Sequence, residues 1–402
     1  MAMADVAPVP ADSRRRVTRV ESIPIALRYI ERIAEITRRR WSQDPPTIKT
    51  WVHRIRTDDG TEGVGEWPAP LDDQALRRLI GRSPFEAVWD DRVGAAQGAL
   101  HDLVGKLLGV PAGSLLGPRL RDRVVSAAWS HAFGPDDGAR ELQLAVQAGF
   151  TQHLVKIRTF GDAIEQVEAM AAVAPAGYRM ALGANGALRT VNEAIRFARE
   201  VERLPSVWAL VQPIPIDDLT GLRRLRQRTD LAIGLHTDRP PMFEALRAEA
   251  CDFFLPELET AITTLRAAAV AGSTGGSFPA GAMAAAFEPD QPRWLEDASG
   301  LPTFPILAGH SVDPPLGHPL WLLNGLYTGL SNAHQLHVAS AIPNALWTLT
   351  LAWLVEDDLI VEPMAVEAGT MAVPTGPGLG VTLDENALER VRTGPSTVVE
   401  VP

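Results

Sequence analysis

The feature that most constrains this chain is a regular alternation of short apolar segments with longer amphipathic ones from Val124 to Leu255. The short segments have the length of buried strands, and the longer ones carry apolar residues at helical spacing. Repeated strand–helix units build a parallel sheet covered by helices. So many repeats favour a (β/α)₈ barrel, which takes about 250 residues. An open doubly wound sheet is the alternative, but no glycine-rich nucleotide-binding loop follows the first strand.

The barrel pattern is clear for six strands and then blurs. The expected strands are 124–132, 153–158, 179–182, 208–211, 231–235 and 252–255. The expected helices are 136–148, 163–173, 191–204, 219–226 and 242–248. We place the seventh strand at Phe304–Leu307, within an insertion near 284–318, and helical segments around 320–356. Long insertions after barrel strands normally lie at the catalytic rim, so we expect this one there.

The residues before the barrel predict a second, smaller domain. Strands are expected over 17–66, with a turn at Asp58-Asp59-Gly60, and helices over 72–109. We therefore divide the 402 residues into a mobile tail, an α+β domain, a barrel and a C-terminal segment. Their bounds are 1–16, 17–123, 124–356 and 357–402.

Composition excludes several classes of function. The net charge of −11 argues against sequence-independent nucleic-acid binding, which needs a basic face. No apolar stretch reaches the 18 residues of a membrane span, so no membrane partner is expected. Cys251 is the lone cysteine, so no intramolecular disulfide forms and the cytoplasm is the expected compartment.

Four segments, in this order, resemble one family. Residues 58–66, 99–111, 155–158 and 374–380 are similar to conserved elements of the mandelate racemase and muconate lactonizing enzyme branch of the enolase superfamily. The elements are the capping-domain hairpin, the helix leading into the barrel, the Lys-x-Lys strand and the C-terminal turn. The resemblance covers about residues 17–390. It implies a modified (β/α)₈ barrel with an α+β N-terminal capping domain and a C-terminal segment that returns to the cap. It also implies a small-molecule substrate bound between cap and barrel, and a homo-oligomer.

The resemblance implies a magnesium ion that stabilises an enediolate, held by one acid from each of the third, fourth and fifth strands. The positions that correspond here are Gly183, Gln212 and Thr237, and a shift of one residue in the fifth strand would place His236 or Asp238 there instead of Thr237. Glycine offers no ligand, and neutral oxygens do not offset the dehydration cost of a doubly charged ion. We therefore predict that the family magnesium site is lost and that no cofactor is bound. Asp238, Glu257 and Glu259 are the acids nearby that leave a displaced site conceivable.

The same strand ends carry residues for other chemistry. We predict Lys156, Arg158 and His236 as catalytic residues and Asn185, Gln212, Asp238, Glu257 and His310 as substrate-binding residues. Buried lysine and histidine exchange protons near neutral pH, whereas arginine stays charged and suits an anion clamp. His310 resembles the histidine that some racemases place after the seventh strand. A structural ion pair is the alternative role for Arg158 and Lys156.

Three functions are compatible with these residues. The favoured one is a metal-independent isomerase, cyclase or lyase that acts by general acid–base chemistry on a small organic substrate. The second is a non-catalytic descendant that binds a small molecule or serves as a scaffold. The third is a magnesium-dependent racemase, cycloisomerase or dehydratase with displaced ligands.

Overall fold

The computed structural model describes residues 15–42, 44, 46–158, 160–237, 240–257, 260–272, 318–323 and 327–401. Several predictions fall outside these residues: Asp238, Glu259, His310, the strand at Phe304–Leu307, and most of the tail and of the insertion.

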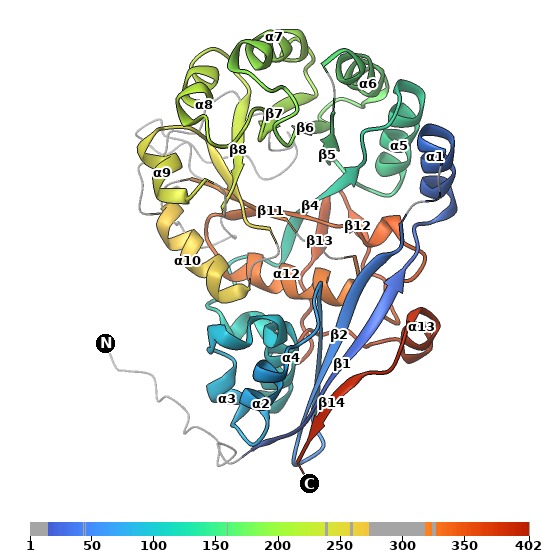
Figure 1. The fold of residues 1–402 in the computed structure, drawn as a ribbon, viewed down its shortest axis with the longest axis vertical. Coiled ribbons are helices and arrows are strands. Elements are labelled where there is room, and N and C mark those ends of the chain that lie inside the picture. Colours follow the sequence, from blue (N-terminus) through green and yellow to red (C-terminus); the bar gives the residue numbers. More distant parts are fainter. Residues whose placement is uncertain are drawn as a thin grey trace.

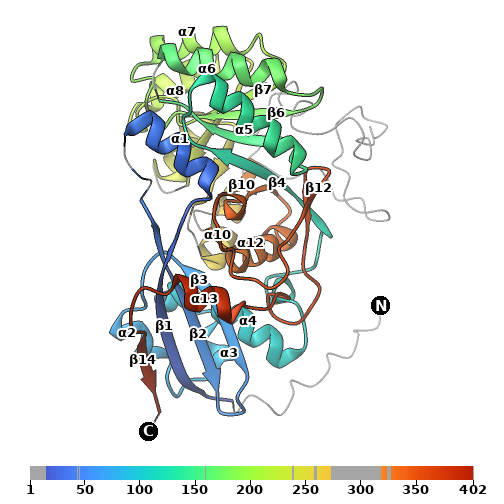
Figure 2. The same ribbon diagram turned by 90° about the vertical axis from the view of Figure 1, so that its right-hand side faces the viewer.

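The N-terminal part is an antiparallel sheet with helices on one side (Figure 2). The sheet order is β14-β1-β2-β3, formed by Thr397–Glu400, Val17–Leu27, Ile48–Thr57 and Glu62–Trp67. Its helices are α2 (Asp73–Leu79), α3 (Pro84–Ala87), the 3₁₀ turn η2 (Asp91–Ala96) and α4 (Gln97–Leu108). The C-terminal strand β14 pairs with β1, so the last residues of the chain lie against the first strand.

Helix α1 (Glu31–Trp41) was not predicted from the sequence and lies between β1 and β2. It packs on the outside of the barrel beside α5 (Figure 1). Arg32 Nε donates to Glu141 Oε1 at 3.0 Å, and the Glu141 side chain is only 1% exposed. Ile33 and Ile36 are buried in the same cluster as the barrel interior. The β1–β2 connection is therefore fixed to the barrel wall.

The remainder is a closed parallel barrel surrounded by helices, as the sequence predicts (Figure 1). Its strands are β4 (Arg123–Ser130), β5 (Gln152–Lys156), β6 (Arg179–Gly183), β7 (Val207–Val211), β8 (Ala232–His236), β9 (Phe253–Leu255), β10 (Leu320–Leu322) and β11 (Ala345–Leu349), and β11 pairs with β4 to close the ring. Its helices are α5 (Pro135–Gln147), α6 (Phe160–Val173), α7 (Val191–Val201), α8 (Leu219–Arg226), α9 (Met242–Arg247), α10 (Ala261–Gly272) and α12 (Gly329–Ala341).

The prediction was wrong in the last third of the barrel. The seventh strand is β10, not Phe304–Leu307, and β10 and β11 both lie in the stretch expected to be helical. Such strands are fully buried and short, so their apolar runs have no alternation that separates them from a buried helix. Only α12 within this stretch is a long helix.

Aromatic side chains fill the interior of the barrel. Trp208, Phe253, Trp321 and Trp347 are at most 2% exposed, and their rings contact one another at centroid distances of 5.4–6.4 Å. Trp321 Nε1 donates to the carbonyl of Thr348 at 3.1 Å. The barrel is therefore a packed core, and chemistry is confined to the strand ends.

A buried carboxylate joins the cap to the C-terminal turn. Asp102 on α4 accepts hydrogen bonds from Val64 N and Leu379 N, each at 2.8 Å, and from Lys106 Nζ at 2.6 Å. Gly378 has a φ of +68°, and a Cβ there would lie 2.2 Å from Asp102 Oδ1. The turn at 374–380 thus needs glycine both for its left-handed backbone and for this close approach.

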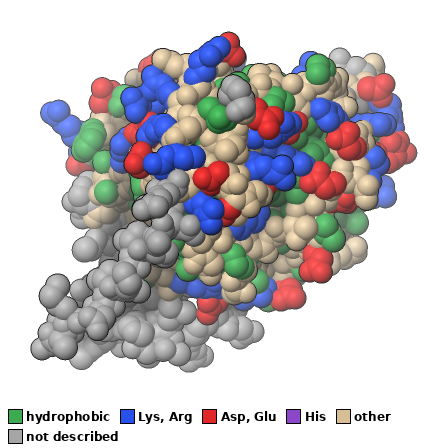
Figure 3. Space-filling model, turned by 90° about the horizontal axis from the view of Figure 1, so that it is seen from below, with side chains coloured by type: hydrophobic (Ala, Val, Ile, Leu, Met, Phe, Trp, Pro, Cys, Tyr) green, Lys and Arg blue, Asp and Glu red, His purple; other side chains and the backbone are tan. Residues whose placement is uncertain are grey.

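After the barrel, the chain forms the hairpin β12 (Val366–Glu367) and β13 (Thr370–Ala372), then helix α13 (Glu385–Val391). Strand β13 pairs antiparallel with β4. On the face seen from the cap side, basic and acidic side chains are interspersed rather than gathered into one field (Figure 3). Within the described ranges, no helix has both the length and the apolarity needed to cross a bilayer.

Candidate functional site at the barrel mouth

Polar side chains gather where the barrel strands end, an edge that we call the barrel mouth. Parallel strands bring their carboxyl ends to one edge, so residues distant in sequence meet there. Lys156 and His236 are the last residues of β5 and β8, and Glu257 follows β9. The strand order predicted from the sequence thus brings the three together.

Lys156 occupies the space beside the third-strand position that is glycine in this chain. Its Nζ donates to Asn185 Oδ1 at 2.8 Å. A Cβ at Gly183 would lie 3.2 Å from Lys156 Cδ and 3.5 Å from Nζ. Burial lowers the pKa of Lys156, and the charge of Glu257 opposes that shift in part. An acidic side chain at position 183 would therefore meet an amine whose proton is already loosely held.

His236 and Glu257 are in contact at the ends of β8 and β9. His236 Nδ1 lies 3.1 Å from Glu257 Oε2, with the His236 side chain 8% exposed and that of Glu257 46% exposed. The angle at Nδ1 does not qualify as an aligned hydrogen bond, so the contact is chiefly electrostatic. Contact with His236 lowers the pKa of Glu257 against the effect of burial, and Lys156 lowers it further. The carboxylate therefore stays ionised and holds the imidazole in place.

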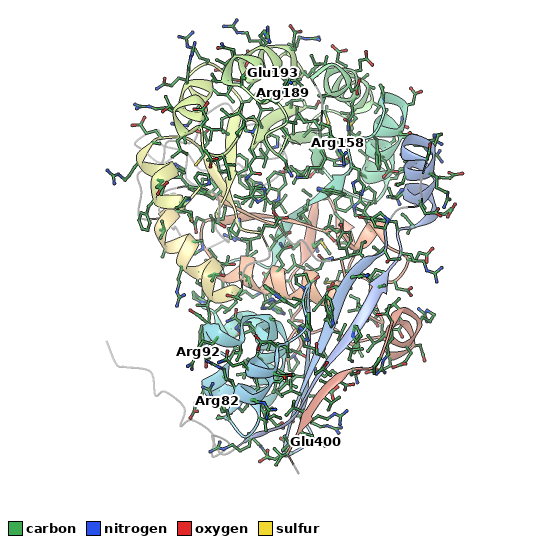
Figure 4. The ribbon with its side chains drawn as sticks, viewed as in Figure 1. Arg82, Arg92, Arg158, Arg189, Glu193 and Glu400 are labelled. Carbon is green, nitrogen blue, oxygen red and sulfur yellow. The ribbon has the colours of Figure 1, made fainter. Side chains whose placement is uncertain are left out.

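The remaining predicted residues surround this pair. Arg158 lies just beyond β5 and is exposed (Figure 4). Gln212 has a φ of +45°, unusual for a residue with a side chain, and its backbone bonds to Gly234 O at 2.9 Å and Gly186 N at 2.7 Å. Thr237 is buried, 9% exposed. These contacts fix the backbone of the fourth and fifth strand ends.

His310 lies outside the described residues, so its substrate-binding role stays a prediction. The seventh barrel strand is β10, which begins at Leu320, after His310 in the chain.

Sequence reasoning missed an aromatic group at the same edge. His131 follows β4, and its ring lies 4.4 Å from Trp129 and 5.6 Å from Tyr29. Burial lowers the pKa of His131 to about 4, helped by the charges of Arg158 and Lys156. Tyr29 Oη lies 3.2 Å from Tyr327 Oη. The strand-end rule applied to 124–132 would have found His131, whereas Tyr29 precedes a helix that the pattern did not predict.

The three strand-end positions that the family resemblance assigns to magnesium ligands carry no carboxylate in this chain. Magnesium needs oxygen ligands in octahedral geometry, usually with carboxylates among them. Gly183 supplies none, and the amine of Lys156 lies beside it. The carboxylate of Glu257 is engaged by His236. Across the described ranges there is no cluster of three or more His, Cys, Asp or Glu able to hold a metal.

The chain belongs to the enolase superfamily. The family described as "Enolase C-terminal domain-like" matches residues 137–287 and 316–387, which is more than half of the chain. The match spans the barrel after its first strand, and the turn that contacts Asp102.

Characterised relatives are lyases and isomerases. D-xylonate dehydratase of Haloferax volcanii is 25% identical over 358 residues, covering 81% of this chain and 76% of its own. Muconate cycloisomerase 1-2 of Acinetobacter lwoffii is 28% identical over 309 residues, 74% of this chain and 69% of its own. Both relatives are by name a lyase or an isomerase, and they fit the third alternative, the dehydratase or cycloisomerase, better than the favoured metal-independent one.

Solved structures share the fold. N-succinyl Arg/Lys racemase of Bacillus cereus has a TM-score of 0.71 and 15% identity, covering 96% of this chain and 100% of its own. A muconate lactonizing enzyme of Pseudomonas fluorescens has a TM-score of 0.71 and 21% identity, covering 94% and 100%. At these identities the likeness establishes the capped barrel and not the substrate.

Proposed function

We propose that this chain is an isomerase or lyase that moves a proton on a small organic acid held at the barrel mouth. The observation that carries the proposal is the placement of two proton-transfer groups, Lys156 and the His236–Glu257 pair, on strands β5 and β8 of one ring. A base and an acid on different sides of a substrate can catalyse both kinds of reaction named for the relatives, a dehydration and a cycloisomerisation.

The residues divide the work as follows. The neutral amine of Lys156 takes the proton from the carbon next to the substrate carboxylate and becomes an ammonium. The new ammonium and the guanidinium of Arg158 stabilise the negative charge that develops on the carboxylate oxygens. His236, with its imidazolium held by Glu257, gives a proton either to the opposite face of that carbon or to a departing hydroxyl. The first outcome is an isomerisation and the second is a dehydration.

We further propose that this chemistry runs without the family magnesium. The support is the glycine at position 183, the Lys156 amine 3.5 Å from where its Cβ would be, and the engagement of Glu257 by His236. An ammonium next to the developing charge supplies part of the stabilisation that a divalent ion would give. The competing hypothesis is a magnesium-dependent dehydratase or cycloisomerase whose ligands are displaced, and the relatives' names favour it as far as reaction class is concerned.

The test is proton exchange in D₂O on a panel of organic acids that includes D-xylonate, D-gluconate and muconolactone, followed by ¹H NMR. We expect one class of acid to exchange or to turn over, with the rate unchanged after EDTA treatment. Lys156→Met should abolish the signal and Arg158→Gln should reduce it. Arg189→Gln is the matched control, since the Arg189 side chain is 79% exposed and pairs with Glu193 on α7 at 3.5 Å (Figure 4).

Two outcomes would contradict the proposal. Activity that EDTA removes and magnesium restores would establish the metal-dependent alternative. A folded protein that exchanges no proton on any acid of the panel, and yet binds one of them, would favour the non-catalytic alternative.

A further inference from the structure

A cavity lies between the cap and the barrel, apart from Lys156, Arg158 and His236, none of which lines it. Its volume is about 60 Å³, and it is partly open to solvent. The cap contributes Glu66 and Trp67 from β3, and the barrel contributes residues of β10 and α12, including His334 and Gln335. The site chemistry assigned to the mouth therefore leaves this cavity without a role.

The distinctive group in the cavity wall is the carboxylate of Glu66, which is 6% exposed. Its Oε2 accepts from Thr328 N at 3.2 Å and from Thr328 Oγ1 at 2.5 Å, at the start of α12. Its Oε1 is buried and has no hydrogen bond of acceptable geometry among the described residues. Burial raises the pKa of Glu66, and the nearby polar groups of Thr328, Ser331 and Thr50 oppose that shift. A buried carboxylate oxygen with no donor is unfavourable unless a ligand supplies one.

Neighbouring groups that line the cavity can also accept hydrogen bonds. Gln335 Nε2 donates to Leu322 O at 2.8 Å, which leaves its amide oxygen for another partner. His334 is uncharged at neutral pH, since burial lowers its pKa to about 4, and its Nε2 contacts His101 Nδ1 at 2.8 Å. The lining includes Trp67 and contains no lysine or arginine among its described residues. Acceptors, an aromatic ring and no competing cation are the surroundings that an ammonium requires.

We propose that this cavity binds an ammonium group, with Glu66 Oε1 as its counter-charge and the amide oxygen of Gln335 as a second acceptor. The ligand is a small primary amine, or the amino end of a longer molecule. Binding at this site can be measured without turnover, so its failure is distinguishable from a failure of the reaction proposed for the mouth. It is nevertheless adjacent, since Leu323 lines it and pairs with Glu257.

The experiment titrates the full-length protein with n-propylammonium chloride at constant ionic strength and follows binding by calorimetry. The isosteric neutral probe is 1-propanol. Glu66→Gln keeps an acceptor for Thr328 but removes the charge. Glu62→Gln is the matched control, because Glu62 lies on the same strand and does not line the cavity.

We expect saturable binding of n-propylammonium at one site per chain, at least tenfold weaker in Glu66→Gln, unchanged in Glu62→Gln, and absent for 1-propanol. Thermal melting checks that each variant is folded. Equal binding by wild type and a folded Glu66→Gln, equal binding of the alcohol, or no binding at all would overturn the proposal. If the Glu66→Gln variant does not fold, Gln335→Leu must weaken binding, and an unchanged affinity there would overturn it too.

A final arm separates the two sources of the ammonium. If the amine is a separate ligand, n-propylammonium bound at the cavity leaves Lys156-dependent exchange intact. If the ammonium belongs to the substrate, n-propylammonium inhibits that exchange competitively. Both results require the Glu66-dependent binding described above.

Discussion

Replacing Gly183 with aspartate restores the acid that the third-strand position carries in the family resemblance. The new Cβ would lie 3.2 Å from Lys156 Cδ and 3.5 Å from Nζ, so a carboxylate one bond further falls within ion-pair distance of the amine. An opposite charge this near raises a lysine pKa by about 1–3 units. The fraction of neutral amine at a fixed pH below that pKa then falls by about 10- to 1000-fold.

The expected result is a loss of proton exchange of about the same factor at pH 7–8, with the acid limb of the pH–rate profile displaced upward by about 1–3 units. The pKa can be measured directly, because the chain has only three lysines, Lys49, Lys106 and Lys156. Labelling with [ε-¹³C]lysine gives one resonance from each. Lys106, paired with Asp102 at 2.6 Å, is an internal reference.

Gly183→Asn is the control, because it has nearly the same shape as aspartate and no charge. It should leave the Lys156 pKa close to the wild-type value. If Gly183→Asp instead gains activity, and magnesium increases it, Lys156 is not acting as an unpaired base and the reasoning fails. An unchanged Lys156 resonance in Gly183→Asp would also contradict the geometry.

Three further predictions follow from the same contacts. Glu257→Gln removes a charge that raises the pKa of Lys156, so that pKa should fall further and the acid limb of the exchange profile should move to lower pH. Burial lowers the pKa of His153 to about 3 and of His334 to about 4, so between pH 6.5 and 4 the unfolded chain binds protons that the folded one does not. The free energy of unfolding should therefore decrease as pH falls, by about 1.4 kcal/mol per pH unit for each such histidine. Urea unfolding at several pH values should show a weaker dependence of this free energy on pH in His334→Asn than in the wild type. The family resemblance predicts a homo-oligomer, so light scattering should give a multiple of 43.4 kDa, and a monomer at all concentrations would contradict it.

The sequence predicted the fold well where local patterns are strong. Strands β1, β2 and β3 lie, to within one residue, in the 17–66 stretch where strands were expected, and the helix at 219–226 agrees to the residue. The pattern of apolar residues was insufficient where tertiary contacts determine the secondary structure. Helix α1 depends on its ion pair with Glu141 across the cap–barrel boundary, and nothing in the order of residues 31–41 indicates that partner.

The candidate site could be predicted from the sequence to the extent that the carboxyl ends of the strands could be located. Lys156 and Asn185 were predicted from the family resemblance and His236 from its place at a strand end, and the parallel strands bring such ends to one edge. The contact between His236 and Glu257 could not be predicted, because a single sequence does not indicate which residues of different strands lie next to each other. The amine beside Gly183 depends on the Lys156 rotamer, and the cavity around Glu66 depends on how cap and barrel pack.

The central claim, that Lys156 takes the place of a divalent ion, is tested most directly by Mn²⁺ titration of the [ε-¹³C]lysine-labelled protein. Manganese has ligand preferences like those of magnesium, and its unpaired electrons broaden nearby resonances. We predict that stoichiometric Mn²⁺ leaves the Lys156 ε-carbon resonance as sharp as that of Lys49. Selective loss of the Lys156 signal at one equivalent, reversed by EDTA, would place a metal at the barrel mouth and contradict the account.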